Sequence, residues 1–409
     1  MSPCRLCSAP LRQVVADLGT TPLANSYLQP HELNKMEPYY PLRALVCEHC
    51  WLVQLEAAVA PEAIFSNYKY FSSFSDTLLH HSRAYADLMA QRLSLQRGDR
   101  VVEIASNDGY LLRYFVDKGM DVLGIEPAAN VAEVARDRGI PTVSRFFGSE
   151  TARDLVAERP KPSLVVANNV LAHVPGLNDF VAGLKILLAP GGTITLEFHH
   201  LLSLIVSDQF DTIYHEHFQY FSLGTARAAL ATHGLAVVDV DELAMQGGSL
   251  RIYAKHANEV DGGESASVRS VLAKEDAAGL QTMACYAAFS DRIRRIKLDL
   301  LAFLVGARQA GQSVLCYGAA AKGNTLLNYC GIRADLVEAA VDRSPHKQGL
   351  CLPGSRIPIH HPDRVKDVKP DYLLILPWNI RDEIMAQMAH IRDWGGRFVV
   401  AVPRLQVLP

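Results

Sequence analysis

The sequence has no long apolar run and no excess of basic residues. None of its 409 residues belongs to a run of about 18 apolar residues, and the first ten, MSPCRLCSAP, lack the apolar segment of a secretory signal. The 40 Lys and Arg residues are matched by 43 Asp and Glu residues, which gives a net charge of -3. We therefore expect a cytoplasmic protein that binds neither membranes nor nucleic acid, as a monomer or weak homo-oligomer.

Two common metal and nucleotide patterns are also missing. The stretch FDTIYHEHFQYFS, residues 210–222, is similar to a zinc-protease helix, but the residue four positions after His215 is Gln219. The turn in VVEIASNDGYLL has one glycine, Gly109, where a dinucleotide fingerprint has three. The sequence therefore argues against a metalloprotease and against an NAD-dependent dehydrogenase.

Four of the eight cysteines form two Cys-x-x-Cys pairs. They are Cys4, Cys7, Cys47 and Cys50. Each pair can direct two thiolates at one ion, and the two pairs together complete a tetrahedral zinc site, although His49 could replace one thiolate. Four ligands leave no open position, so we predict one structural zinc ion per chain. A redox role, or cysteines without metal, are the alternatives.

Hydrophobic patterns divide the chain into three parts. Residues 1–75 show little apolar periodicity, residues 76–255 alternate strand-like and helical runs, and residues 256–409 restart that alternation after a polar GGESAS stretch. Alternating strands and helices are typical of a mostly parallel sheet. We predict an α/β protein with an N-terminal zinc-binding domain, a central Rossmann-like domain and a second, nucleotide-binding-like α/β domain, with these boundaries.

The turn after the first central strand is predicted to hold a nucleoside cofactor. A strand-to-helix turn presents backbone N–H groups and a helix N-terminus to a ligand, and an acidic residue about twenty positions on can accept hydrogen bonds from ribose hydroxyls. A cofactor without pyrophosphate, S-adenosylmethionine, fits one glycine better than NAD does. Asn168 and Asn169 could instead form a turn or a helix cap. The predicted contacts are Glu103, Ala105, Ser106, Asn107, Asp108, Gly109, Glu126, Pro127, Asn168, Asn169 and His173.

Several motifs, spread over nearly the whole chain, carry a family resemblance. They are CRLC with CEHC, YKYFSSFSD, VEIASNDGYLL, GIEPA, FDTIYHEHFQYFS, GGSLR, YGAAAKGNTLLN, VDRSPHKQG and PWN. With them the chain resembles bacterial sugar C-methyltransferases that act on nucleotide-linked deoxy-ketosugars. The resemblance implies a zinc-binding domain, a central S-adenosylmethionine domain and a C-terminal domain that helps hold the sugar nucleotide. Gln246 precedes GGSLR, where the family often has a histidine.

The loop GAAAKG, residues 318–323, is predicted to hold the nucleotide of the substrate. Its small side chains let backbone N–H groups approach a phosphate, while Lys322 supplies a charge. Close helix–sheet packing, or NAD binding as in a reductase, are the alternatives. The predicted substrate contacts are Tyr317, Gly318, Ala319, Ala320, Ala321, Lys322, Gly323, Asn324, Asp342, Arg343, His346, Lys347, Trp378 and Asn379.

Methylation of a ketosugar at carbon needs a base and a group that stabilises the enolate. We predict His217 as the base, because an imidazole with a pKa of about 6.5 is largely neutral at pH 7, with Glu216 raising its basicity or relaying the proton. Tyr214, Tyr68 and Tyr70 are candidate donors to the oxyanion. A helix would separate the two histidines of HEH and a strand would put them on one face, so the choice of base stays open.

The prediction for the whole chain is an S-adenosylmethionine-dependent C-methyltransferase. Its expected substrate is a dTDP-linked 4-keto-deoxysugar, methylated beside the ketone, at C-3', as in antibiotic and deoxysugar biosynthesis. Methylation at C-5' or at an oxygen or nitrogen of a nucleotide sugar, and a scaffold without activity, are the alternatives.

Overall fold

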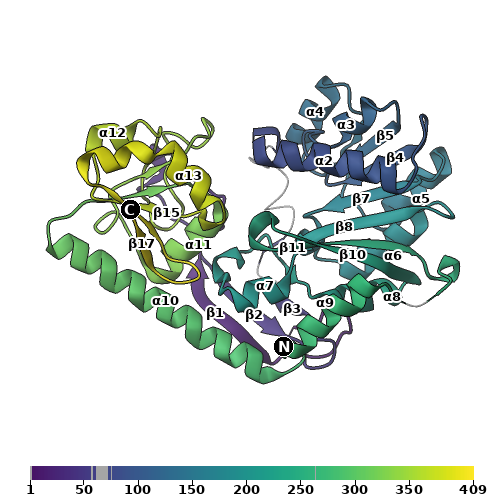
Figure 1. The fold of residues 1–409 in the computed structure, drawn as a ribbon, viewed down its shortest axis with the longest axis horizontal. Coiled ribbons are helices and arrows are strands. Elements are labelled where there is room, and N and C mark those ends of the chain that lie inside the picture. The colour runs from purple at the N-terminus through teal and green to yellow at the C-terminus, as the bar shows by residue number, and fades with distance from the viewer. Residues whose placement is uncertain (1, 57–58, 61–71, 75, 263) are drawn as a thin grey trace.

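The computed structural model describes residues 2–56, 59–60, 72–74, 76–262 and 264–409 (Figure 1). The described part contains three sheets. The central and C-terminal sheets lie in separate lobes of the molecule, with the N-terminal strands between and below them in Figure 1. The predicted fold class is thereby confirmed, whereas the boundaries after residues 75 and 255 stay predictions.

The central sheet has seven strands in the order β10-β11-β8-β7-β4-β5-β6. All neighbours from β8 to β6 pair in parallel, and β11 runs antiparallel to β8 and β10. The carboxyl ends of the parallel strands therefore share one edge, where open α/β sheets bind ligands. The strands are β4 (Arg100–Ile104), β5 (Asp121–Ile125), β6 (Thr142–Val143), β7 (Leu164–Asn168), β8 (Thr193–His199), β10 (Leu235–Leu243) and β11 (Ser249–His256). The helices are α2 (Asp76–Arg92), α3 (Leu112–Val116), α4 (Ala129–Asp137), α5 (Ser149–Glu158), α6 (Leu177–Leu187), α7 (Leu201–Val206) and α8 (Leu223–Ala231).

The C-terminal sheet has six strands in the order β14-β13-β12-β15-β16-β17. The first five are parallel, and β17 is antiparallel to β16. Two helices, α9 (Ala266–Ala277) and the long α10 (Met283–Gln309), lead into it from the central sheet (Figure 1). The other elements are β12 (Val314–Tyr317), α11 (Ala321–Cys330), β13 (Ala340–Val341), β14 (Ile359–His360), α12 (Arg364–Val368), β15 (Tyr372–Ile375), α13 (Arg381–Gln387), β16 (Arg397–Val400) and β17 (Gln406–Leu408).

The N-terminal sheet combines strands that are far apart in the sequence. β1 (Gln13–Thr21), β2 (Tyr40–Val46) and β3 (Val53–Leu55) form an antiparallel sheet, and β9 (Gln219–Tyr220) is its fourth strand. Val53 pairs with Tyr220, and Gln54 pairs with Gln219. The end of the FDTIYHEHFQYFS stretch is therefore part of the sheet built by the cysteine-containing segment.

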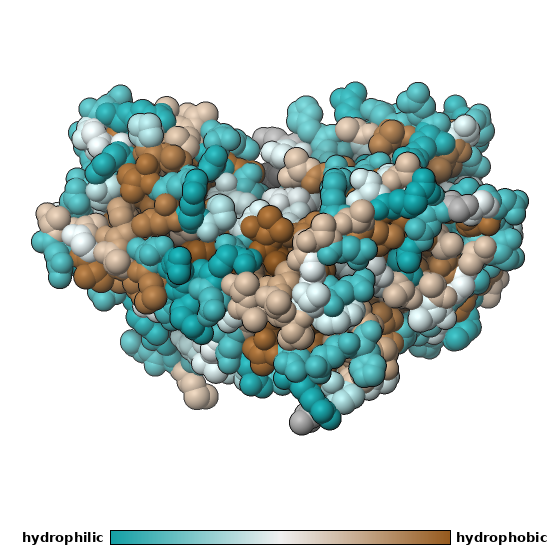
Figure 2. All heavy atoms as spheres, turned by 60° about the horizontal axis from the view of Figure 1, so that its bottom comes forward, coloured by the Kyte–Doolittle hydropathy of each residue, from teal (hydrophilic) through white to brown (hydrophobic). Residues whose placement is uncertain are grey.

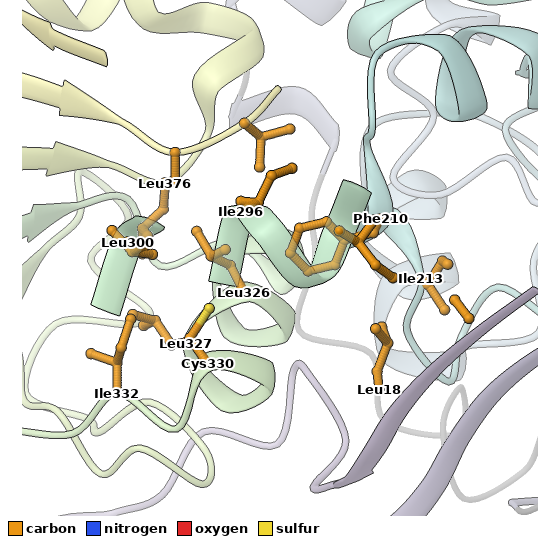
Figure 3. Packing of buried hydrophobic residues seen from close by; sticks show 14 of the residues in the cluster. Leu18, Phe210, Ile213, Ile296, Leu300, Leu326, Leu327, Cys330, Ile332 and Leu376 are labelled. Carbon is orange, nitrogen blue, oxygen red and sulfur yellow. The ribbon is translucent and has the colours of Figure 1, made fainter. Parts of the chain in front are cut away.

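One hydrophobic cluster joins the N-terminal sheet, the segment before β9 and the C-terminal sheet. Leu18 of β1, Phe210, Leu300 of α10, Leu327 of α11 and Leu376 belong to it (Figure 3). These side chains are all 3% exposed or less. Because protein interiors are close-packed, this shared core holds the three parts in a fixed arrangement.

Helix α10 has one buried side and one exposed side. Its buried residues recur at the three- and four-residue spacing of an amphipathic helix, and they are Tyr286, Phe289, Ile293, Ile296, Leu300, Leu304 and Ala307. Leu298, two residues before Leu300, is 60% exposed.

Figure 2 shows hydrophobic side chains in separate groups among hydrophilic ones on one face of the molecule. In the described part of the chain, no helix is long and apolar enough to span a membrane.

Replacing Leu300 by Ala should lower the free energy of unfolding by about 2–5 kcal/mol, because deleting a buried leucine leaves a cavity in the shared core. Leu298→Ala is the matched control on the exposed side of α10 and should change it by less than about 0.5 kcal/mol. Chemical denaturation followed by circular dichroism measures both. Equal losses in the two variants would contradict the assigned buried side.

Candidate functional site

Four cysteines meet at one point. The sulfur atoms of Cys4, Cys7, Cys47 and Cys50 all lie within 4.8 Å of one another. A tetrahedral zinc ion with Zn–S bonds of about 2.3 Å needs sulfur atoms about 3.8 Å apart, so the cluster fits zinc. His49 is exposed and lies outside this cluster.

The two cysteine pairs make similar turns and connect directly to the N-terminal sheet. Ser8 and Trp51, the residues after each pair, have left-handed φ angles of 61° and 62°. Gln54 of β3 donates from Nε2 to the Cys4 sulfur at 3.2 Å, and the Cys47 N–H donates to the Leu52 carbonyl at 3.1 Å. The metal site therefore anchors the connection between β2 and β3.

The predicted cofactor turn has a strained backbone that is held by Glu126. Ala105, Asn107 and Gly109 have φ angles of 55°, 49° and 78°, a left-handed region that residues other than glycine adopt uncommonly. The backbone N–H groups of Asn107 and Ala128 each donate to one Glu126 oxygen at 2.9 Å. Each carboxylate oxygen keeps a second lone pair, so Glu126 can also accept from a ligand hydroxyl.

The residues predicted to bind the cofactor fall into two groups. Gly109 is packed so closely that an added Cβ would lie 2.8 Å from Ile140, and the Asp108 carboxylate pairs with Arg138 at 2.9 Å. Burial raises the pKa of Glu103 well above its ordinary value. Of the predicted contacts, those that do not line the cavity described next are Glu103, Ser106, Asp108 and Gly109. Those that line it are Ala105, Asn107, Glu126, Pro127, Asn168, Asn169 and His173.

A cavity of about 720 Å³ brings all three parts of the chain together. It extends from the cofactor turn to the FDTIYHEHFQYFS stretch and on to the C-terminal loop. The central stretch contributes Tyr214, Glu216 and His217, and the N-terminal part contributes Asn25. The Asn168 Oδ1 atom is buried without a partner among the described residues, so this wall has an acceptor for a ligand donor. Gln246, Gln219 and Tyr220 also line the cavity.

The FDTIYHEHFQYFS stretch is neither a helix nor a long strand. A short 3-10 helix, η4 (Phe210–Thr212), is followed by a turn and then by β9. His217 Nδ1 lies 2.8 Å from the Thr212 carbonyl oxygen. A carbonyl only accepts, so Nδ1 carries the hydrogen and Nε2 keeps its lone pair. Burial, and secondarily His173, lower the pKa of His217 well below its ordinary value, which keeps the ring neutral.

Two rings pack against His217 and help to fix it. The Tyr214 ring centroid lies 4.0 Å from that of His217, and the His173 centroid lies 4.8 Å away. His173 Nδ1 donates to the Glu216 carbonyl oxygen at 2.8 Å, and burial lowers the pKa of His173 to about 4. His173, predicted as a cofactor contact, thus also lies against the predicted base.

The other predicted catalytic residues have different surroundings. Asn25 Nδ2 donates to Glu216 Oε1 at 2.5 Å. His215 points away from the cavity, since its Nε2 donates to the Pro41 carbonyl at 3.1 Å and its ring packs edge-on against Tyr40. The remaining predicted oxyanion donors, Tyr68 and Tyr70, lie outside the described residues.

His199 is a cavity residue that the sequence reasoning missed. Its Nε2 donates to Gln209 Oε1 at 2.6 Å, and Gln209 Nε2 in turn donates to the Gly247 carbonyl at 2.8 Å. Burial, and secondarily Lys322, lower the pKa of His199 to about 4. The signal was its position at the end of β8, because the argument that found Asn168 at the end of β7 applies there equally.

Lys322, in the first turn of α11, reaches the same cavity from the C-terminal part of the chain. Its Nζ donates to Asn379 Oδ1 at 2.9 Å and lies 4.9 Å from the Trp378 ring centroid. Trp378 Nε1 donates to Asp211 Oδ2 at 2.7 Å, and this hydrogen bond connects the segment after β15 to η4. Burial lowers the pKa of Lys322, and Asp211 opposes that shift.

The remaining predicted substrate contacts surround this loop without all reaching the cavity. Lys347 Nζ donates to the Ala319 carbonyl at 2.9 Å, and the Ala319 N–H donates to Asp342 Oδ2 at 2.7 Å. Those that line the cavity are Ala320, Ala321, Lys322, Lys347 and Asn379. Those that do not are Tyr317, Gly318, Ala319, Gly323, Asn324, Asp342, Arg343, His346 and Trp378.

Removing a zinc ligand should destabilise the N-terminal sheet, because metal binding supplies folding energy, on the order of 10 kcal/mol for a structural zinc. We expect Cys47→Ser to lose the one zinc ion per chain and to lower solubility. Elemental analysis of the purified protein measures the metal. Cys285→Ser, outside the cluster, should keep the zinc, and an unchanged zinc content in Cys47→Ser would contradict the site.

Comparisons with known proteins match three consecutive segments of the chain. A zinc binding domain matches residues 4–65, a methyltransferase domain matches residues 78–240, and a C-methyltransferase C-terminal domain matches residues 244–403. C-methyltransferase NovU of Streptomyces niveus is 36% identical over 405 residues, which are 99% of this chain and 96% of that protein. Trans-aconitate 2-methyltransferase of Mycobacterium tuberculosis is 30% identical over 122 residues, which are 29% of this chain and 43% of that protein.

The match to NovU covers nearly the whole of both chains. The cysteine cluster lies in the zinc-binding segment, and the strained cofactor turn lies in the methyltransferase segment. S-adenosylmethionine is the cofactor, and zinc belongs to the N-terminal domain. The protein is a member of the S-adenosylmethionine-dependent C-methyltransferases that carry an N-terminal zinc-binding domain.

Proposed function

We propose that this C-methyltransferase methylates the carbon beside the ketone of a nucleotide-linked deoxy-ketosugar through an enolate. The proposed substrate is a dTDP-linked 4-keto-deoxysugar, and the proposed position is C-3'. Ala105, Asn107 and Glu126 would hold S-adenosylmethionine, and Lys322 and Lys347 would hold the nucleotide diphosphate. The cytoplasm is the proposed location.

The observation that carries the proposal is the single cavity shared by three kinds of residues. Its wall includes the cofactor turn, a neutral histidine whose Nε2 keeps a lone pair, and two lysines of the C-terminal part of the chain. Two ammonium groups suit a diphosphate, and a neutral imidazole suits the removal of a proton from carbon. A volume of about 720 Å³ lies within the usual range of 300–1,000 Å³ for small-molecule sites.

The proposed step balances in protons and electrons. His217 Nε2 takes the proton from the carbon beside the ketone, and the electron pair of that C–H bond moves into the enolate. Tyr214 donates to the enolate oxygen. When bound, S-adenosylmethionine supplies a methyl group on a positively charged sulfur. The enolate carbon would bond to this methyl as the methyl–sulfur bond breaks, which would leave S-adenosylhomocysteine, a methylated ketone and a proton that His217 would release to solvent.

Other substrates would use the same cavity differently. Methylation at an oxygen or nitrogen needs only a base that deprotonates a hydroxyl or amine, so a carbon-bound proton would not exchange with solvent. Methylation at C-5' would exchange a proton on the other side of the ketone. The position of deuterium in recovered sugar nucleotide therefore distinguishes these cases.

Deprotonation should be visible without methyl transfer. In heavy water with S-adenosylhomocysteine and a ketosugar nucleotide, the wild type should incorporate deuterium beside the ketone, and His217→Ala should lose about 10²–10⁴-fold in rate. Because burial lowers the pKa of His217, the base stays neutral to lower pH, and exchange should persist below about pH 6.5. NMR of the sugar measures the rate.

The buried neighbour His215 is the matched control, and His215→Gln should retain exchange. Exchange at the wild-type rate in His217→Ala, with loss in Tyr214→Phe or Glu216→Gln, would move the role of base to one of those residues. If the wild type exchanges no carbon-bound proton with any ketosugar, the enolate mechanism is wrong.

Lys322→Ala should weaken binding of the sugar nucleotide while the affinity for S-adenosylmethionine stays nearly unchanged, because the two ligands are assigned to different sheets. Losing one charged contact typically costs about 1.5–3 kcal/mol, or roughly 10- to 100-fold in affinity. Calorimetry separates the two ligands. Lys366→Ala, on the exposed surface of α12, is the control, and loss of cofactor affinity alone in Lys322→Ala would reverse the assignment.

A further inference from the structure

Asn25 belongs to the N-terminal part of the chain but lies in the cavity wall. It follows β1 by four residues, and its Nδ2 donates to Glu216 Oε1 at 2.5 Å. Glu216 is 3% exposed, so its carboxylate depends on protein donors more than on water. The zinc-binding domain therefore contributes a side chain directly to the residue beside the proposed base.

Tyr27 attaches the Asn25 segment to the C-terminal part of the chain. Its hydroxyl donates to the Ala319 carbonyl at 2.5 Å and lies 3.3 Å from Asn25 Oδ1. Asn324 Nδ2 donates to the Ala24 carbonyl at 2.7 Å. Burial raises the pKa of Tyr27, so the phenol stays protonated and remains a donor. The backbone around Asn25 is thus held on both sides by the C-terminal part.

Ala319 lies in the loop proposed to hold the substrate nucleotide. Its carbonyl accepts from both Tyr27 and Lys347, and its N–H donates to Asp342. Lys347 also lines the cavity. Tyr27 therefore lies between the nucleotide loop and Asn25, and Asn25 donates to the carboxylate of Glu216.

We propose that Asn25 is a positioning residue that orients the Glu216 carboxylate, and that Tyr27 and Ala319 hold Asn25 in place. The inference rests on the proposed function of Glu216 as the partner of the base. A residue of the zinc-binding domain then completes the site, which gives that domain a part in proton transfer as well as in folding.

A double-mutant cycle tests this role. Asn25→Ala should lower the rate of deuterium incorporation about 10- to 100-fold, while zinc content and S-adenosylmethionine affinity stay as in the wild type. In a Glu216→Gln background the same change should cost less than about 3-fold, because the carboxylate that Asn25 orients is gone. Ser26→Ala, at the neighbouring exposed position, should keep the wild-type rate. Losses that multiply, or a wild-type rate in Asn25→Ala, would overturn the inference.

A second measurement needs no substrate. In protein labelled with ¹³C at glutamate carboxyls, the Glu216 resonance is identified by its absence from Glu216→Gln. It should titrate at higher pH in Asn25→Ala, because losing a donor to the charged form favours protonation. Tyr27 interacts electrostatically with this carboxylate and is the same in both proteins. An unshifted titration would overturn the inference, whereas a shifted titration without exchange in the wild type would overturn only the proposed function.

Discussion

The pairing of β9 with β3 is the contact on which the site depends. β3 follows the second cysteine pair, and β9 begins two residues after His217. The two paired residues of each strand therefore link the zinc cluster to the proposed base. Gln219 of β9 also donates from Nε2 to the Leu171 and Val174 carbonyls at 3.1 and 2.7 Å, beyond the end of β7. A two-residue strand thereby joins the metal site, the segment of the proposed base and the cofactor edge of the central sheet. Such a short strand is stable only because its neighbours are fixed by metal and by core packing.

Burial sets the chemistry of the cavity wall. Desolvation disfavours charged forms, so His173, His199 and His217 have lowered pKa values and stay neutral. The same effect lowers the pKa of Lys322 and raises that of Asp211 to about 6. In such a buried site, a neutral base and preorganised donors act more strongly on developing charge than they would in water.

The shared hydrophobic cluster explains how a cavity between separate sheets keeps its shape. Leu18 of the N-terminal sheet, Phe210 before the turn that holds His217 and Leu376 after β15 pack in one core. The Trp378–Asp211 hydrogen bond crosses the same junction. A change in this core would therefore alter the distance between Lys322 and His217 without touching either residue.

The sequence by itself predicted the cysteine cluster, the two α/β halves and the cofactor turn, and it singled out His217 as the candidate base, because these features depend on local spacing or on residues joined by one strand and one turn. It left open whether HEH was helical or extended, and the structure shows a turn whose Thr212 carbonyl selects the histidine tautomer. It gave no signal for Asn25. For His199 the signal was its position at the end of a parallel strand, and the prediction did not use it. Their roles arise from contacts across about 190 residues of chain and from a strand end that meets Gln209. Only tertiary packing decides such contacts, because neither hydrophobic periodicity nor residue type indicates which distant segments line the same cavity.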